Sequence, residues 1–329
     1  MTQAVLEYLL FLAKTLTLVA AIVFVIGVFV NLSRRQREAE GLKLTNLNTR
    51  LRRAADGLRL ALLPKAERKK LVKQRKKEAK ASQSDRRKRV FVIDFRGDIR
   101  ASGTSSLREE VSALLAVAEQ SDEVLVRLEN AGGLVHEHGL AASQLVRIRD
   151  RGIPLTVAVD KVAASGGYLM ACVANRILAA PFAIVGSIGV LAQVPNFRRM
   201  LDERGITVEQ VKAGRYKRTV SMFGDVTDED REKLREELEE VHTLFQAMVG
   251  KYRPQLDLER VATGEYWYGS RALGLELVDA LGTSDDWLAQ RVGEADVWKL
   301  EWRGHKRLIE KLAATMEEGR AGSWLRRGW

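Results

Sequence analysis

The sequence has 329 residues, more than one small domain needs and enough for a large buried core. Its single cysteine, Cys172, excludes an internal disulfide and a thiolate metal cluster, and the apolar run around it predicts a buried structural thiol. The net charge is +11, but 13 Lys or Arg and 3 acidic residues fall between Lys65 and Arg89, so the remaining chain is nearly neutral and a basic face over the whole molecule is excluded.

The stretch from Tyr8 to Val30 is strongly apolar, with Lys14 as its one charge. Its 23 residues are long enough to cross a hydrocarbon core of about 30 Å at 1.5 Å per residue. No Lys or Arg precedes it, and three arginines follow at Arg34, Arg35 and Arg37, the reverse of a cleaved signal peptide. We therefore expect an uncleaved transmembrane anchor in residues 1–32. The positive-inside rule then predicts that the rest of the chain is cytoplasmic.

Residues 33–89 are rich in Lys, Arg, Glu, Gln and Leu, which predicts helical segments in a charged linker. The basic part, residues 65–89, is interpreted as a solvated spacer. Attraction to anionic lipid head groups is the alternative, because the segment is tethered near a membrane. A nucleic-acid partner is not expected, because residues 33–89 contain no aromatic side chain on which a base could stack.

From Val90 onward, apolar strands alternate with helices. The expected strands are Val90–Phe95, Glu123–Leu128, Leu155–Asp160, Ile177–Ala180 and Ile184–Val194, and the expected helices are Ser106–Glu119 and Leu134–Arg149. A capping box, Ser106-x-x-Glu109, is expected to open the first helix. Continuous apolar strands separated by helices indicate an α/β fold with a largely parallel sheet that is covered on both faces.

A second capping signal, Thr227-x-x-Asp230, predicts a long helix. Its apolar stripe is expected to contact the core or another subunit, and consists of Leu234, Leu238, Val241, Phe245 and Met248. The C-terminal tail, residues 286–329, contains five tryptophans and no clear motif.

Ser165 lies in a small-residue segment between an apolar strand, Ile153–Val159, and an apolar stretch typical of a helix, Tyr168–Ala174. A corner of this kind exposes a hydroxyl and lets backbone N–H groups face an oxyanion. Serine is a poor nucleophile without a base, so a base is needed.

The histidines are weak candidates for that base. His136 and His138 follow Gly132-Gly133 at the start of a helix and are interpreted as polar residues at the surface or at the helix end. His242 and His305 are expected to be exposed. A lysine serves as a base when burial disfavours its charged form.

Three lysines are therefore compared. Lys161 is beside Asp160, which favours the charged form, whereas Lys212 and Lys217 flank a turn after an expected strand, Thr207–Val211. Residue types alone leave this choice open.

Five blocks of sequence carry a family resemblance: Ala164–Tyr168, Gly186–Val190, Lys212–Arg218, Ala262–Gly269 and Gly274–Asp279. In this order and at these separations they resemble the signal peptide peptidase A family of serine proteases, closest to its SohB branch. The resemblance extends from about Val90 to Asp285, and the peptidase domain is accordingly expected in residues 90–285.

The resemblance implies a ClpP/crotonase-like fold and a Ser/Lys dyad. Ser165 would be the nucleophile, Lys217 the general base, and Ser187 the residue that orients the lysine. Gly132, Gly133 and Gly166 would supply the backbone N–H groups of an oxyanion hole. This chain has Ala131 where the family usually has proline, which leaves those N–H groups in place.

These features predict a membrane-anchored serine endopeptidase of the bacterial inner membrane. Its expected substrates are extended peptides or unfolded segments, including remnants of signal peptides, and the resemblance implies a homo-oligomer. No metal or organic cofactor is expected. Two other functions stay open: a crotonase-like enzyme acting on acyl thioesters, and a non-catalytic membrane scaffold. The side of the membrane also stays open, because better-known bacterial relatives act in the periplasm.

Overall fold

The computed structural model describes residues 8–9, 11–20, 23, 41–64, 67–68 and 87–304. Residues 44–301 form one compact unit, and the described residues outside that range belong to a second unit. The expected anchor, residues 8–30, is described only in part, and those residues are helical and exposed. Within the described ranges, no helix combines the length and apolar character that a membrane crossing requires. Most of the basic segment 65–89 and the end of the tail, from residue 305, lie outside the described residues.

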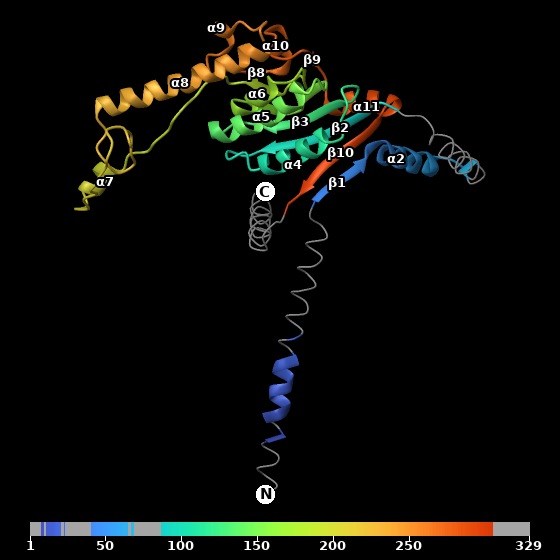
Figure 1. Ribbon diagram of the computed structural model, residues 1–329, viewed down its shortest axis with the longest axis horizontal. Helices are drawn as coiled ribbons and strands as arrows, with labels where there is room; N and C mark the ends of the chain where they lie inside the picture. Colours follow the sequence, from blue (N-terminus) through green and yellow to red (C-terminus); the bar gives the residue numbers. More distant parts are fainter. Residues whose placement is uncertain are drawn as a thin grey trace, which may run out of the picture. The chain divides into compact units, whose positions relative to one another are not determined.

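One sheet of ten strands organises the fold, in the order β1-β10-β2-β3-β4-β6-β9, with β5 beside β3, β7 beside β5 and β8 beside β7 (Figure 1). Its strands are β1 (Gly41–Asn46), β2 (Arg89–Gly97), β3 (Glu123–Asn130), β4 (Leu155–Val159), β5 (Val162–Ala164), β6 (Arg176–Ala179), β7 (Ile184–Gly186), β8 (Tyr266–Tyr268), β9 (Ala280–Leu281) and β10 (Asp296–Arg303). The pairs from β10 through β2, β3, β4 and β6 are parallel, and β7 with β8 is antiparallel. The expected α/β class is confirmed.

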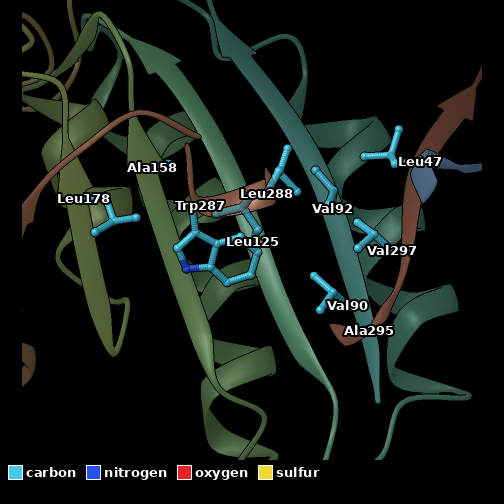
Figure 2. Packing of buried hydrophobic residues seen from close by; sticks show 10 residues of the cluster. All are labelled: Leu47, Val90, Val92, Leu125, Ala158, Leu178, Trp287, Leu288, Ala295 and Val297. Carbon is cyan, nitrogen blue, oxygen red and sulfur yellow. The ribbon is translucent and has the colours of Figure 1, made fainter. Parts of the chain in front are cut away.

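One face of the sheet packs against α11 (Ser284–Glu294) and the start of α2 (Leu47–Leu62), where Leu47 and Asn48 are buried. Figure 2 shows the ten side chains of this core: Leu47, Val90, Val92, Leu125, Ala158, Leu178, Trp287, Leu288, Ala295 and Val297. Asn48 joins the same region, because its amide donates to the carbonyls of Val292 and Ala295 and its oxygen accepts from the Val297 N–H. The segment expected as a linker thus supplies β1 and α2, and the expected tail supplies most of α11 and β10.

The other face is covered by α4 (Thr104–Leu115), α5 (Val135–Asp150) and α6 (Gly166–Ala171). Because both faces are covered, β2 buries Val90 and Val92 on one side and Phe91, Ile93 and Phe95 on the other. The capping box at Ser106 is wrong. Helix α4 begins at Thr104, without a side-chain cap, so Ser106 lies inside the first turn.

Two expected strands are also corrected. The run from Ile184 ends as a strand at Gly186, because Gly186 and Ser187 both adopt positive φ (98° and 53°) and turn the chain out of the sheet. Residues 207–211 form no strand and are exposed. They belong to an excursion, defined here as residues 189–227, which contains the short helix α7 (Arg198–Asp202) and leads into α8 (Asp228–Tyr252).

Helix α8 begins with the expected capping box at Thr227 and Asp230, which confirms that prediction. Of its apolar stripe, however, only Phe245 is buried, near the C-terminal end where α8 contacts α6. Directly after α8, Arg253 is 3% exposed and forms a bidentate ion pair with the Asp279 carboxylate, with both N–O distances at 2.8 Å. Two short helices follow, α9 (Leu258–Val261) and α10 (Gly269–Gly274).

Cys172 is fully buried, as expected, and its thiol donates to the Leu169 carbonyl at 3.2 Å. Burial raises the pKa of the Cys172 thiol to about 12. At pH 8, roughly one thiol in 10⁴ is then ionised, and only the thiolate reacts readily. We expect a water-soluble thiol reagent to modify the native protein very slowly and to modify one thiol per chain rapidly in denaturant. Fast labelling of the native protein would contradict the buried placement.

Candidate active site

Ser165 lies at a strained corner between β5 and α6. Its φ of 52° and ψ of −120° are unusual for a residue other than glycine. Its N–H donates to the Gly186 carbonyl at 2.8 Å, and its carbonyl accepts from the Leu169 N–H at 3.0 Å. The backbone is held on both sides, while the side chain is partly exposed. The corner therefore presents the hydroxyl to solvent on a fixed backbone.

The Gly132 loop, defined here as residues 131–133, follows β3 and packs directly on this corner. A Cβ at Gly132 would lie 2.7 Å from the Ser165 Cβ and 2.9 Å from the Gly166 nitrogen, too close for any side chain. Gly133 is equally constrained, because a Cβ there would lie 2.1 Å from the Ile99 carbonyl oxygen. Positive φ at both residues (93° and 155°) adds a second reason for glycine.

Ser187 comes to the same edge of the sheet. Ala164 on β5 pairs with Gly186 on β7 in parallel register, so Ser165 and Ser187 each follow a paired residue. Ser187 has a positive φ of 53°, is partly exposed, and donates its N–H to the Glu265 carbonyl at 2.7 Å. The tertiary structure thus brings Ser165, Ser187 and the Gly132 loop together, as the carboxyl ends of neighbouring parallel strands do in this fold class.

The three glycine N–H groups are not equivalent. The Gly132 N–H already donates to the Asn130 side-chain oxygen at 2.8 Å. Within the described part of the chain, no protein acceptor is found for the N–H of Gly133 or of Gly166. In this geometry those two donors are available to an oxyanion, and Gly132 instead shapes the loop that presents them.

The structure changes the interpretation of His138. This residue lies in the first turn of α5, as expected, but it is fully buried rather than at the surface. Its ring packs beneath the corner, where a Cβ on Gly166 would lie 2.5 Å from His138 Cγ. Its Nε2 lies 3.2 Å from the Asn130 side-chain oxygen. By contrast His136 is exposed, 3.8 Å from the Glu137 carboxylate.

The sequence predictions included neither a role for Asn130 nor the burial of His138, although a sequence pattern indicates each of them. Asn130 lies two residues before Gly132, a spacing typical of an Asn side chain that binds its own backbone in a turn. His138 shares a helical stripe with Ala141, Ala142 and Leu145, all fully buried.

Lys217 is not brought to Ser165 in the single chain. It is exposed, and among the described residues its side-chain amine has no partner. The neighbouring residues Arg215 and Tyr216 bind the Glu229 carboxylate at 2.6 and 3.3 Å, which ties this turn to the start of α8. Since α8 reaches the body of the domain near Phe245, the turn lies roughly 24 Å away along the helix axis, at 1.5 Å per residue. Figure 1 shows the excursion at the end of α8 that is remote from the sheet.

The other two lysines have different surroundings. Lys161 is exposed and pairs with the Glu129 carboxylate at 2.9 Å. Lys212 lies on the excursion and donates to the Arg218 carbonyl at 3.3 Å. His242 is partly buried on α8, 3.4 Å from the Gln246 amide. His305 lies outside the described residues.

Comparison with known proteins gives the same picture as the sequence motifs. Residues 3–145 match the N-terminal model of peptidase family S49, and residues 147–297 match the model of peptidase family S49 itself. A probable protease SohB from Haemophilus influenzae is 43% identical over 326 residues, covering 94% of this chain and 92% of that protein. Another, from Buchnera aphidicola, is 50% identical over 230 residues, covering 70% of this chain and 68% of that protein.

Among solved structures, the 1510-N membrane-bound stomatin-specific protease in complex with a substrate peptide matches with a TM-score of 0.40 and 11% identity, covering 70% of this chain and 99% of that one. The two family models together, and the Haemophilus influenzae relative, span nearly the whole chain. The chain therefore belongs to peptidase family S49, in its SohB branch.

Proposed function

We propose that this peptidase is a serine endopeptidase that cleaves extended peptides or unfolded protein segments through an acyl-enzyme on Ser165. The observation that carries the proposal is the corner itself. It places a partly exposed hydroxyl on a strained backbone, with one available N–H donor at Gly166 in the corner and a second at Gly133 in the glycine loop packed against it. Such a constellation fits acyl transfer, in which a nucleophile and oxyanion donors must converge on one carbonyl.

The proposed reaction has two stages. Ser165 Oγ attacks the scissile carbonyl carbon while its proton passes to the neutral Lys217 amine, and the oxyanion accepts hydrogen bonds from Gly133 and Gly166. The C–N bond then breaks, the departing amine takes the proton from Lys217, and the acyl group stays on Ser165. In the second stage a water gives a proton to Lys217 and attacks the ester carbonyl. The bond between the acyl carbon and Ser165 Oγ then breaks, Lys217 returns the proton to Ser165 Oγ, and the acid is released. Ser187 would orient the lysine through its hydroxyl.

The dyad requires Lys217 to approach Ser165 and to lose contact with water, because only the neutral amine accepts a proton. The excursion that carries it exposes apolar side chains, among them Leu191 (82%) and Val211 (96%). Covering these in a homo-oligomer would bury apolar surface and desolvate the lysine at the same time. We therefore include in the proposal that the active form is an oligomer.

A serine-directed covalent probe tests this function against a crotonase-like thioester enzyme, which needs no serine nucleophile. We expect a fluorophosphonate to label the wild-type full chain at Ser165, with the modified peptide identified by mass spectrometry. An unlabelled protein that nevertheless turns over acyl thioesters would favour the alternative.

Membrane attachment is a separate part of the proposal. We propose that residues 8–30 anchor the chain in a bacterial inner membrane in a single pass, with the basic segment 65–89 drawn to anionic lipid head groups. The basic residues that follow the apolar stretch support a cytoplasmic catalytic domain. A C-terminal reporter fusion that is active on only one side of the membrane is expected to report the cytoplasmic side. Periplasmic activity would reverse the orientation.

A further inference from the structure

Beneath the Ser165 corner lies a buried polar pair that the proposed reaction does not use. His138 is fully buried and Asn130 is 1% exposed. The two side chains meet at 3.2 Å, between His138 Nε2 and Asn130 Oδ1. Burying a polar group without a hydrogen bond lowers the stability of the fold. Each donor and acceptor of this pair is therefore expected to have a partner.

The Gly132 N–H fixes the orientation of the Asn130 amide. It donates to Asn130 Oδ1 at 2.8 Å, and the reversed amide is excluded because a backbone N–H has no lone pair with which to bind an NH₂ group. The other amide atom, Nδ2, faces the sulfur of Met170 at 3.5 Å. The Asn130 atom that faces His138 is therefore an acceptor, so a hydrogen bond between the two side chains requires the proton to be on His138 Nε2.

The second ring nitrogen also faces an acceptor. His138 Nδ1 lies 2.9 Å from the Leu134 carbonyl oxygen, which receives the His138 backbone N–H as well. A neutral imidazole has one N–H and keeps one of the two ring contacts as a hydrogen bond, whereas the doubly protonated ring keeps both. In either case the bond to Asn130 needs a proton on Nε2.

This pair connects directly to the reacting corner. Asn130 Oδ1 holds the Gly132 N–H, and Gly132 packs on Ser165. The backbone carbonyl of Asn130 also presses on Gly167, where a Cβ would lie 2.1 Å away. A side chain that fixes Asn130 therefore fixes both the loop that carries the Gly133 N–H and the turn that carries the Gly166 N–H.

We propose that His138 is a positioning residue: its Nε2–H holds the Asn130 side chain, which holds the Gly132 loop so that the Gly133 and Gly166 N–H groups converge beside Ser165. The inference rests on the proposed peptidase function for its catalytic consequence. Its structural half, the hold of His138 on the loop, stands independently of the reaction.

The first test compares variants of the full-length protein on an unfolded peptide substrate. His138→Phe keeps the ring volume and removes both nitrogens. We expect kcat to fall about 10- to 100-fold, a smaller loss than the removal of an oxyanion donor causes, and KM to change by less than about threefold. His138→Gln, which replaces the Nε2 donor by an amide, is expected to restore most of kcat.

Two further variants separate positioning from general destabilisation. Gln144→Leu is the matched control, because Gln144 is 6% exposed on the same helix and donates to the Leu140 carbonyl but does not contact Asn130. It is expected to leave kcat unchanged. Asn130→Ala is expected to match His138→Phe, and the double variant is expected to be no worse than Asn130→Ala, since His138 acts through Asn130. Additive losses would overturn the inference.

Two measurements do not depend on peptidase activity. In hydrogen–deuterium exchange, amides of residues 129–134 are expected to exchange faster in His138→Phe and in Asn130→Ala than in the wild type or Gln144→Leu. If His138→Phe fails to fold, ¹⁵N-histidine NMR of the wild-type chain decides the question, with the His138 signal identified by its loss in His138→Gln. A proton on Nε2 is expected, and a bare Nε2 would overturn the inference. A wild type that cleaves no peptide would remove the proposed function while leaving these two outcomes interpretable.

Discussion

Ser165→Ala is expected to abolish peptide cleavage, with kcat reduced by about 10⁴-fold or more, as is typical when a nucleophilic serine is removed. The loss should come from chemistry alone, because alanine also has a Cβ and therefore experiences the same positive φ as Ser165. The measurement is steady-state cleavage of an unfolded peptide by the full chain, together with a thermal unfolding scan to show that the fold is intact.

The matched control is Ser143→Ala, an exposed serine on α5 whose hydroxyl donates to the Gly139 carbonyl. It should cleave at the wild-type rate. Wild-type turnover by Ser165→Ala would eliminate the acyl-enzyme on this residue, and with it the Ser/Lys dyad.

Lys217→Ala is the second large effect, with an expected loss of about 10³-fold or more in kcat and little change in stability. The loss follows because an unactivated serine hydroxyl is a poor nucleophile, and stability should be spared because the Lys217 side chain is exposed. Lys212→Ala is the control, since Lys212 lies on the same excursion and is equally exposed. Equal activities for these two variants would remove Lys217 as the base.

The distance between Lys217 and Ser165 in one chain makes a mixing experiment informative. If the lysine reaches the serine of a second copy, then Ser165→Ala and Lys217→Ala chains that are assembled together should regain part of the wild-type activity. If the excursion folds back within its own chain, the mixture should stay inactive. Both outcomes retain the dyad, and they distinguish how it is assembled.

Local sequence patterns correctly predicted the elements that depend mainly on neighbouring residues. The apolar runs of β2, β3 and β4 and the capping box at Thr227 needed no distant partner to be recognised. Two predictions were wrong because the local pattern was outweighed by packing in the folded chain. Residues 207–211 have the composition of a strand, but they pair with no strand of the described residues. The Ser106 capping signal lies two residues inside a helix that starts at Thr104 without a side-chain cap.

The charged segment before residue 90 shows the same limit. Its composition predicted a solvated linker, yet Leu47 and Asn48 are buried against β10 and the end of α11, more than 240 residues away in sequence. The sequence of residues 33–89 contains no pattern that indicates the pairing of β1 with β10 at the edge of the sheet. Sheet edges are completed by distant parts of the chain, so composition alone misassigned this segment.

At the candidate site, the sequence by itself determined the family, the order of the elements from β2 to β4, and Ser165 as the residue to examine. The tertiary structure alone decided that the Gly132 loop and Ser187 converge on Ser165, that His138 is buried beneath it, and that Lys217 lies at the far end of α8. The reason is physical. A small-residue corner is a local property of the backbone, whereas convergence depends on strand register and burial, which are set by contacts between residues far apart in the chain.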